Sequence, residues 1–157
     1  MRPKRISIVL PLLGLLSACG GPGDSADVPD AQPAAATFAD IGDHVVHFSA
    51  QSTDQLPPEV ARAYNIVRSK NRAMLNVSVL RETDNTAVKA IVTVKAVNLT
   101  GQLKTVSMRE LIEQGAIYYI GDLPVVNRET LNFDISITPE GIDTPSMVRF
   151  QRQFYTN

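Results

Sequence analysis

The stretch Leu131-Asn132-Phe133-Asp134-Ile135-Ser136-Ile137 alternates strictly between large apolar and polar residues, and it governs the fold expected for the whole chain. Successive side chains of a β-strand point to opposite faces, so a period of two is typical of a strand with one buried face. Leu75, Val77 and Val79 alternate with polar residues in the same way, and residues 87–97 form the longest apolar run. These stretches predict a mainly β protein whose strands are buried on one face.

Further strands are expected at 44–50, 103–112, 116–120 and 146–155, where β-branched and aromatic residues gather between turn residues. The run 103–112 fits neither the helical nor the strand period, and its neighbours favour a strand. About seven strands without crossover helices predict an all-β fold: an antiparallel β-sandwich of immunoglobulin-like architecture, ahead of a barrel. The cysteine pair and tryptophan of antibody domains are missing, so the term describes architecture only.

One short helix is expected in an early connection, after Pro57-Pro58-Glu59. Proline is tolerated in the first turn of a helix, and an acidic residue there suits the positive end of the helix dipole. Apolar side chains then recur at i, i+3, i+4 and i+7, which predicts one buried stripe made of Val60, Ala63, Tyr64 and Val67.

The first residues of the chain have the pattern of an export signal. A basic segment precedes the apolar run from Ile6 to Leu16, and small residues then lead to Cys19. The string Leu16-Ser17-Ala18-Cys19 resembles the lipobox of bacterial lipoproteins, which are cleaved before a cysteine that becomes acylated. This resemblance implies a signal peptide over residues 1–18 and lipidation of Cys19, which is the only cysteine in the sequence.

Residues 19–37 are expected to be the acylated cysteine and a flexible tether, because Gly, Pro, Ala, Ser and Asp dominate there. Removal of residues 1–18 takes away three of the 15 basic residues and leaves 12 against 16 acidic ones, a formal charge of −4. A negative net charge argues against a nucleic-acid partner. It gives no support to charge-based adhesion to a membrane either, so we expect the lipid to attach the protein to the membrane. Gly20 stands where aspartate is associated with inner-membrane retention, and we therefore expect the outer membrane, facing the periplasm.

The folded part is expected to be a single domain, residues 38–157, and its candidate binding segment is Arg68-Ser69-Lys70-Asn71-Arg72. In an extended chain Arg68, Lys70 and Arg72 point to one side within about 14 Å. Together with Asn71 they form a candidate site for a carboxylate, a phosphate, a lipid head group or another partner. The alternative is a solvated connection, or charges that protect a sheet edge from pairing.

Tyr118, Tyr119 and Tyr155 are candidates for a partner surface. Adjacent residues of a strand face opposite sides, so we expect about half of the aromatic rings near them in the core. The other half would form a small exposed aromatic patch.

Motifs for catalysis, metals or cofactors are not found in the sequence. His44 and His47 are the only histidines, and their spacing places them on opposite faces of one strand. Glu110 and Glu113 are neighbours in sequence, which does not make them converge across a cleft as a pair for sugar hydrolysis must. Neither a nucleophile elbow nor a glycine-rich phosphate loop occurs. We therefore assign no catalytic residue, no metal and no cofactor.

Four strings resemble the signatures of a family of small Gram-negative exported proteins, the domain-of-unknown-function family 4426. They are the residues 63–73 (AYNIVRSKNRA), 98–102 (NLTGQ), 116–120 (AIYYI) and 153–155 (QFY). The resemblance covers the chain from about Phe38 onward and implies one compact exported domain without an assigned activity.

The leading interpretation is a periplasm-facing outer-membrane lipoprotein that acts as a non-catalytic binding or envelope-assembly module, with an unidentified protein or envelope component as partner. The sheet edges and loops of a β-sandwich suit such contacts. The alternative is an envelope hydrolase that acts on wall or lipid material with groups that only the fold brings together.

Overall fold

The structure is a computed structural model in which residues 37–157 are described. The predicted signal peptide, Cys19 and residues 20–36 of the predicted tether lie outside the described residues. Within the described part, nine strands, one 3-10 turn and one α-helix follow each other along the chain. They are β1 (Phe38–Asp40), β2 (His44–Ser52), η1 (Thr53–Gln55), α1 (Pro58–Ala63), β3 (Arg72–Arg81), β4 (Ala90–Asn98), β5 (Leu103–Val106), β6 (Arg109–Glu113), β7 (Ala116–Pro124), β8 (Glu129–Pro139) and β9 (Ser146–Phe154).

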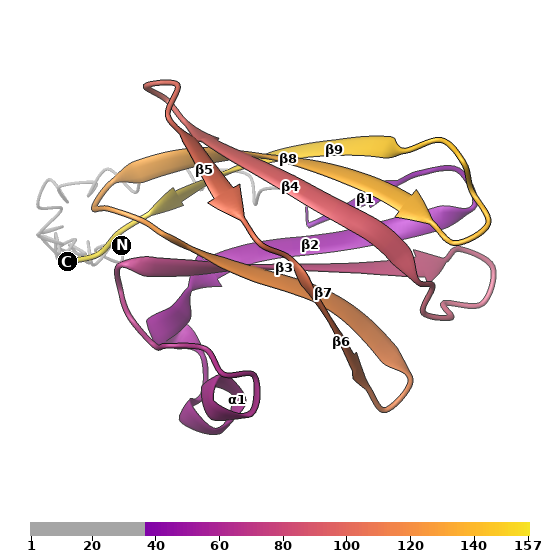
Figure 1. Ribbon diagram of the computed structural model, residues 1–157, viewed down its shortest axis with the longest axis horizontal. Coiled ribbons are helices and arrows are strands. Elements are labelled where there is room, and N and C mark those ends of the chain that lie inside the picture. The colour runs from indigo at the N-terminus through magenta and orange to yellow at the C-terminus, as the bar shows by residue number, and fades with distance from the viewer. Residues whose placement is uncertain (1–36) are drawn as a thin grey trace, which may run out of the picture. The chain divides into compact units, whose positions relative to one another are not determined.

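The strands form two antiparallel sheets that stack as two layers (Figure 1). Sheet A has the strand order β1-β2-β3-β7-β6, and sheet B has the order β5-β4-β8-β9. The chain changes sheet after β3, after β5 and after β7. Helix α1 lies against sheet A, on the face turned away from sheet B (Figure 1). The expected all-β antiparallel sandwich with one short helix is confirmed.

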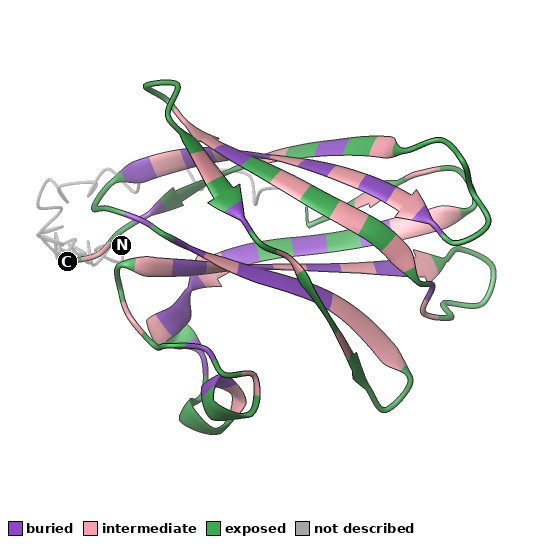
Figure 2. Cartoon of the chain, in the orientation of Figure 1, coloured by how far each residue is buried: buried purple, intermediate pink, exposed green. Residues whose placement is uncertain are grey.

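Strand β8 forms the centre of the core, as its alternation predicts. Leu131, Phe133, Ile135 and Ile137 are fully buried, while the residues between them are partly exposed, and Figure 2 shows the resulting bands along the strand. Each such side chain contributes roughly 1.5–3 kcal/mol when it leaves water. The inward side chains of β3 face this row from sheet A and are equally buried; they are Leu75, Val77 and Val79.

The strand count exceeds the expected seven for two reasons. β1 spans three residues and carries no alternation of its own, so it shows only as the partner of β2. The run 103–112, whose period was mixed, contains two strands: β5 pairs with β4 in sheet B, and β6 pairs with β7 in sheet A. A segment that crosses from one sheet to the other turns a different face toward the core. This change explains why the hydrophobic period of residues 103–112 is mixed.

Gly121 of β7 makes room for this crossing segment. A Cβ atom on Gly121 would lie 2.7 Å from Met108 Sδ, 2.8 Å from Val106 Cγ1 and 2.9 Å from the carbonyl oxygen of Ser107. These distances are too short for non-bonded carbon, so the crossing chain passes over β7 at the one residue that lacks a side chain.

The predicted helical stripe is wrong in detail. The helix ends after six residues, and Asn65 adopts a left-handed conformation with φ of 52°, which stops it before Val67. Val67 is therefore 70 % exposed, and Ala61 is the buried residue of the helix. Among residues 37–157, no helix has both the length and the apolarity required to cross a membrane.

Candidate functional site

The segment Arg68–Arg72 is held from beneath by the buried Thr53 at the start of η1. The Thr53 hydroxyl lies 2.8 Å from the carbonyl oxygen of Val67 and 3.0 Å from that of Ser69, and it accepts the backbone N–H of Ser69 at 2.9 Å. Thr53 is fully buried, so these contacts fix an otherwise irregular chain. The signature string 63–73 thus contains the helix end, this anchored loop and the start of β3.

The cations of this segment contact three different parts of the protein. Arg68 donates to the carbonyl oxygen of Asp54 at 2.6 Å, and Lys70 donates to the oxygen of the last residue, Asn157, at 3.0 Å. Arg72 forms an ion pair with Asp122 of β7, and both side chains are more than a third exposed. The contacts therefore do not gather the three cations around one point. Asn71 is exposed, and its carbonyl oxygen accepts the N–H of Val125 at 2.9 Å. Anion binding by this segment stays a prediction.

The three candidate tyrosines have different environments. Tyr119 is 5 % exposed, so its ring belongs to the core. Its hydroxyl accepts the N–H of Ala90 at 2.7 Å and donates to Glu110 at 3.1 Å. Burial raises the pKa of Tyr119, and the hydrogen bond to Glu110 adds to this, although the Ala90 N–H opposes it. Tyr155 is 63 % exposed beyond β9, and Tyr118 is half-buried on the outer face of sheet A.

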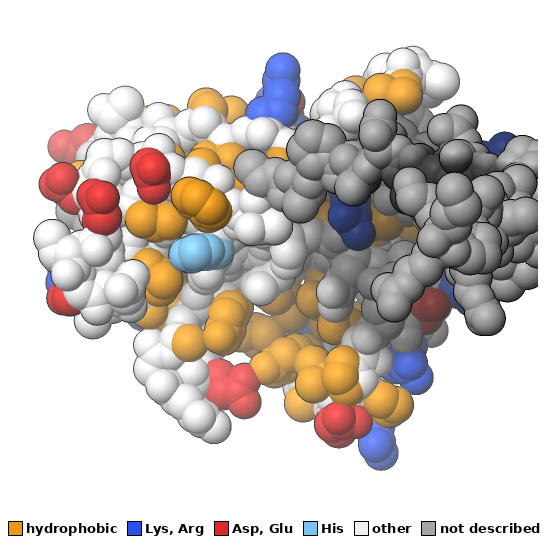
Figure 3. Space-filling model, turned by 180° about the vertical axis from the view of Figure 1, so that it is seen from behind, with side chains coloured by type: hydrophobic (Ala, Val, Ile, Leu, Met, Phe, Trp, Pro, Cys, Tyr) orange, Lys and Arg blue, Asp and Glu red, His pale blue; other side chains and the backbone are white. Residues whose placement is uncertain are grey.

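Tyr118 belongs to a pocket that four separate segments build on the outer face of sheet A. Figure 3 shows hydrophobic side chains gathered in a hollow between the β6–β7 hairpin and α1. The pocket has a volume of about 210 Å³. We call it the tyrosine pocket, and its lining residues are Tyr64, Met74, Asn76, Leu111, Glu113, Tyr118 and Ile120.

Strand alternation and the helix end place these side chains together. Met74 and Asn76 occupy outward positions of β3, Tyr118 and Ile120 those of β7, and Leu111 and Glu113 those of β6. Tyr64 follows α1 directly, and its hydroxyl contacts Glu113 of β6. A small second hydrophobic core lies beneath α1 and adjoins the pocket. Its buried members are Leu56, Ala61, Ile66 and Ile120.

The Glu113 carboxylate, the Tyr64 hydroxyl and Asn76 Oδ1 contribute polar atoms to the tyrosine pocket. The Glu113 carboxylate accepts a hydrogen bond from the Tyr64 hydroxyl through Oε2. This bond raises the pKa of Tyr64, with smaller contributions from burial and from electrostatic interactions with Glu113 and Tyr118, so the hydroxyl remains a donor. Asn76 Oδ1 is buried and has no hydrogen-bond partner among the described residues.

The two glutamates of β6 serve different tyrosines. Glu113 contacts Tyr64 at the tyrosine pocket, whereas Glu110 contacts the buried Tyr119, so the pair does not share a cleft.

His44 and His47 also separate. His47 is exposed, with its ring centroid 6.2 Å from that of Phe38, and His44 lines an open hollow of about 610 Å³ together with Asp40 and Asp43. Within residues 37–157, no three side chains of His, Cys, Asp or Glu are placed to hold a metal ion.

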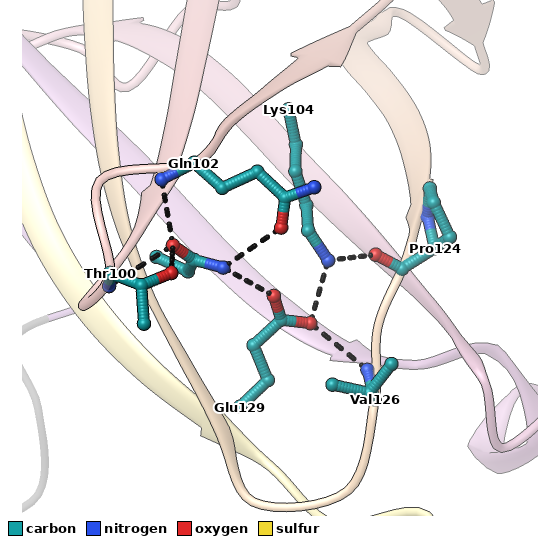
Figure 4. Close-up of polar contacts among 7 residues, drawn as sticks. Thr100, Gln102, Lys104, Pro124, Val126 and Glu129 are labelled. Atoms are coloured by element: carbon teal, nitrogen blue, oxygen red, sulfur yellow. Dashed lines mark hydrogen bonds and ion pairs between the residues drawn. The ribbon is translucent and has the colours of Figure 1, made fainter.

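A second polar cluster, which the sequence did not reveal, joins the two sheets near β5 and the start of β8. Glu129 and Lys104 form an ion pair at 2.6 Å, with side chains only 6 % and 13 % exposed. Lys104 also donates to the carbonyl oxygen of Pro124 at 2.8 Å, and Glu129 accepts from the N–H of Val126 at 2.9 Å and from Asn98 at 3.2 Å (Figure 4). We call Asn98, Lys104 and Glu129 the Glu129 network.

Asn98 also shapes the turn of the string NLTGQ. Its Oδ1 accepts the N–H groups of Thr100 and Gln102 at 3.2 and 2.8 Å, and Gly101 supplies the left-handed conformation with φ of 83°. Burial opposes the ionisation of Glu129. The hydrogen bonds from Lys104, the Val126 N–H and Asn98, together with the lysine charge, outweigh this effect and lower the pKa of Glu129.

Comparison with known proteins places this sandwich in a family. The family model described as a domain of unknown function, DUF4426, matches residues 38–157. The chain belongs to the DUF4426 family. The crystal structure of a DUF4426 family protein from Pseudomonas aeruginosa PAO1 is similar to it with a TM-score of 0.67 and 32 % sequence identity. That match covers 76 % of this chain and 94 % of the Pseudomonas chain.

The DUF4426 sandwich is also similar to a more distant protein, FetP of uropathogenic Escherichia coli strain F11. A copper-bound variant of FetP matches with a TM-score of 0.56 and 10 % identity, over 76 % of this chain and 95 % of FetP. The 'as isolated' form of FetP, recombinantly expressed in the periplasm of E. coli BL21(DE3), matches with the same score and identity, over 78 % of this chain and 95 % of FetP. At this identity the likeness concerns the fold alone. No curated protein matches this DUF4426 chain.

Sequence reasoning found Tyr118 but missed most of the tyrosine pocket. The alternation on β3 indicates that Met74 and Asn76 face outward, but an outward asparagine beside Ser78 is equally typical of a solvent-exposed face. Tyr64 was assigned to a buried helical stripe, and the early helix end is the reason that it lines the pocket instead.

Proposed function

We propose that this DUF4426 chain is a lipid-anchored, non-catalytic binding module, attached to the outer membrane through Cys19 and facing the periplasm. The lipobox-like string Leu16–Cys19 and the glycine that follows it support the anchor and its location. The observation that carries the binding role is the tyrosine pocket, because a folded domain rarely leaves a buried acceptor such as Asn76 Oδ1 without a partner. A ligand group that donates to it would complete the site.

The anchor is tested by labelling growing Gram-negative cells with radioactive palmitate and separating their membranes. The wild-type protein should carry the label and sediment with the outer membrane, and Cys19→Ser should carry none and lose that membrane association. A wild-type protein that is unlabelled, or that remains in the inner membrane, contradicts this part of the proposal.

The binding role is tested with a photo-crosslinking amino acid in place of Tyr118 in the full chain, activated in living cells. The matched control carries the same amino acid at Leu103, a residue of β5 that is 60 % exposed and belongs to sheet B. Position 118 should yield an envelope adduct that position 103 does not. Identical adducts at both positions, or none at position 118, contradict a binding surface at the tyrosine pocket. Release of a cleaved wall or lipid product would favour the hydrolase instead.

A further inference from the structure

The acceptor atoms of the tyrosine pocket require a ligand that supplies a hydrogen-bond donor. Asn76 Oδ1 is a buried acceptor with no partner among residues 37–157. The Glu113 carboxylate has one oxygen bound by the Tyr64 hydroxyl, and a carboxylate has lone pairs on both oxygens for further donors. A ligand whose polar end only accepts hydrogen bonds would leave these atoms unsatisfied, so the complementary group carries N–H or O–H bonds.

The charge of the pocket favours a cation. Glu113 is the only charged side chain among its described lining residues. Arg109, the nearest cation along β6, donates to the carbonyl oxygen of Tyr64, and its side chain is not part of the lining. Two tyrosine rings also line the space, and the negative face of an aromatic ring attracts an ammonium group.

The size and the apolar walls limit the ligand further. A volume of about 210 Å³ lies below the ~300–1,000 Å³ of sites that bind drug-sized molecules or cofactors. Met74, Leu111 and Ile120 supply the apolar lining, against which an aliphatic chain can pack. The thioether of Met74 adapts readily to the shape of such a chain.

We propose that the tyrosine pocket binds a primary alkylammonium group at the end of a short unbranched aliphatic chain. The ammonium group donates to the free Glu113 oxygen, the Asn76 amide turns its Oδ1 toward the group on binding, and the chain lies between Tyr64 and Tyr118. Both a free diamine and the side chain of a lysine have this chemistry. The inference rests on the proposed binding role and names the ligand class of that same pocket.

The test uses the full chain in detergent micelles and follows tyrosine-pocket resonances by NMR during titration. The probes are 1,5-diaminopentane and N-acetyl-lysine methylamide, and N-acetyl-norleucine methylamide is the control that has a similar chain without the ammonium group. Both amines should give saturable shifts at the pocket, and the norleucine control should not. Stronger binding of the lysine amide identifies a peptide source, and stronger binding of the diamine identifies a small molecule.

Two variants localise the effect. Glu113→Gln should weaken amine binding by about tenfold or more, because it removes the charge from the hydrogen bond, and Asn76→Leu should weaken it as well. The exposed Glu82→Gln, which removes a carboxylate elsewhere, should bind as the wild type does. Equal binding of the norleucine control, or unchanged amine binding by Glu113→Gln, overturns the assignment. An envelope adduct at position 118 without amine binding would leave the binding role standing and refute only the ligand class.

Discussion

The Glu129 network and the tyrosine pocket are both polar sites in a mainly apolar sandwich, and they differ in how their hydrogen bonds are satisfied. In the Glu129 network each carboxylate oxygen accepts at least one donor, and the Asn98 amide both donates and accepts. In the tyrosine pocket Asn76 Oδ1 has no partner among the described residues. A satisfied buried cluster stabilises one arrangement of the chain, whereas an unsatisfied buried group lowers stability. We therefore expect the first site to support folding and the second to serve the proposed binding role.

Breaking the Glu129 network should have the largest effect. Lys104→Met leaves a carboxylate that is 6 % exposed without its cation, and we expect the free energy of unfolding to fall by about 3 kcal/mol. Denaturation in urea measures the change. Adding Glu129→Gln to this variant should recover part of the loss, because no buried charge then remains. A single variant as stable as the wild type would show that the network does not support the fold.

A packing change on β7 provides a reference that alters no polar side chain. Gly121→Ala places a methyl group within 3 Å of Met108, Val106 and the backbone of Ser107, and it should cost about 2 kcal/mol. Thermal unfolding of Gly121→Ala and of Gly121→Ala with Met108→Ala is the measurement. The double variant should stay destabilised, because the backbone contact persists. Full recovery would mean that only the flexible methionine end resists the methyl group.

The pH dependence of the Glu129 network follows from the lowered pKa of Glu129. Its contribution is complete above the unfolded-state pKa, with a reference value of 4.5, and it is lost as the pH falls through the lower folded-state pKa. Lys104→Met removes the largest of the causes that lower this pKa, so its stability deficit should be largest near neutral pH and should shrink below about pH 4.5. Urea denaturation of both proteins across this range tests the prediction. A deficit that stays constant with pH would contradict it.

The sheets could be predicted from the sequence because alternation is a local signal. Leu131 to Ile137 shows its buried face without reference to any other segment. The Glu129 network could not be predicted in this way, because Lys104 and Glu129 stand 25 residues apart with strands β6 and β7 between them. The NLTGQ string is visible in the sequence, but the contact of Asn98 with the glutamate is not.

The tyrosine pocket depends on non-local contacts even more. Its lining comes from the residue after α1 and from outward positions of β3, β6 and β7. Tyr118 could be singled out as an aromatic residue of a strand, whereas the role of Tyr64 depends on where the helix ends. The cations of Arg68–Arg72 illustrate the opposite case, since a conspicuous sequence cluster is distributed over separate intramolecular contacts.

The most direct test of the contrast is the same substitution at both asparagines. Asn98→Leu removes the acceptor of a turn and a donor to Glu129, and it should lower the free energy of unfolding by about 2 kcal/mol. Asn76→Leu replaces an unsatisfied amide by an apolar group of similar size, so stability should stay the same or rise by up to about 1 kcal/mol while amine binding weakens. Urea denaturation of the two variants beside the wild type decides the matter. An Asn76→Leu protein that loses as much stability as Asn98→Leu would contradict the assignment of the tyrosine pocket to binding.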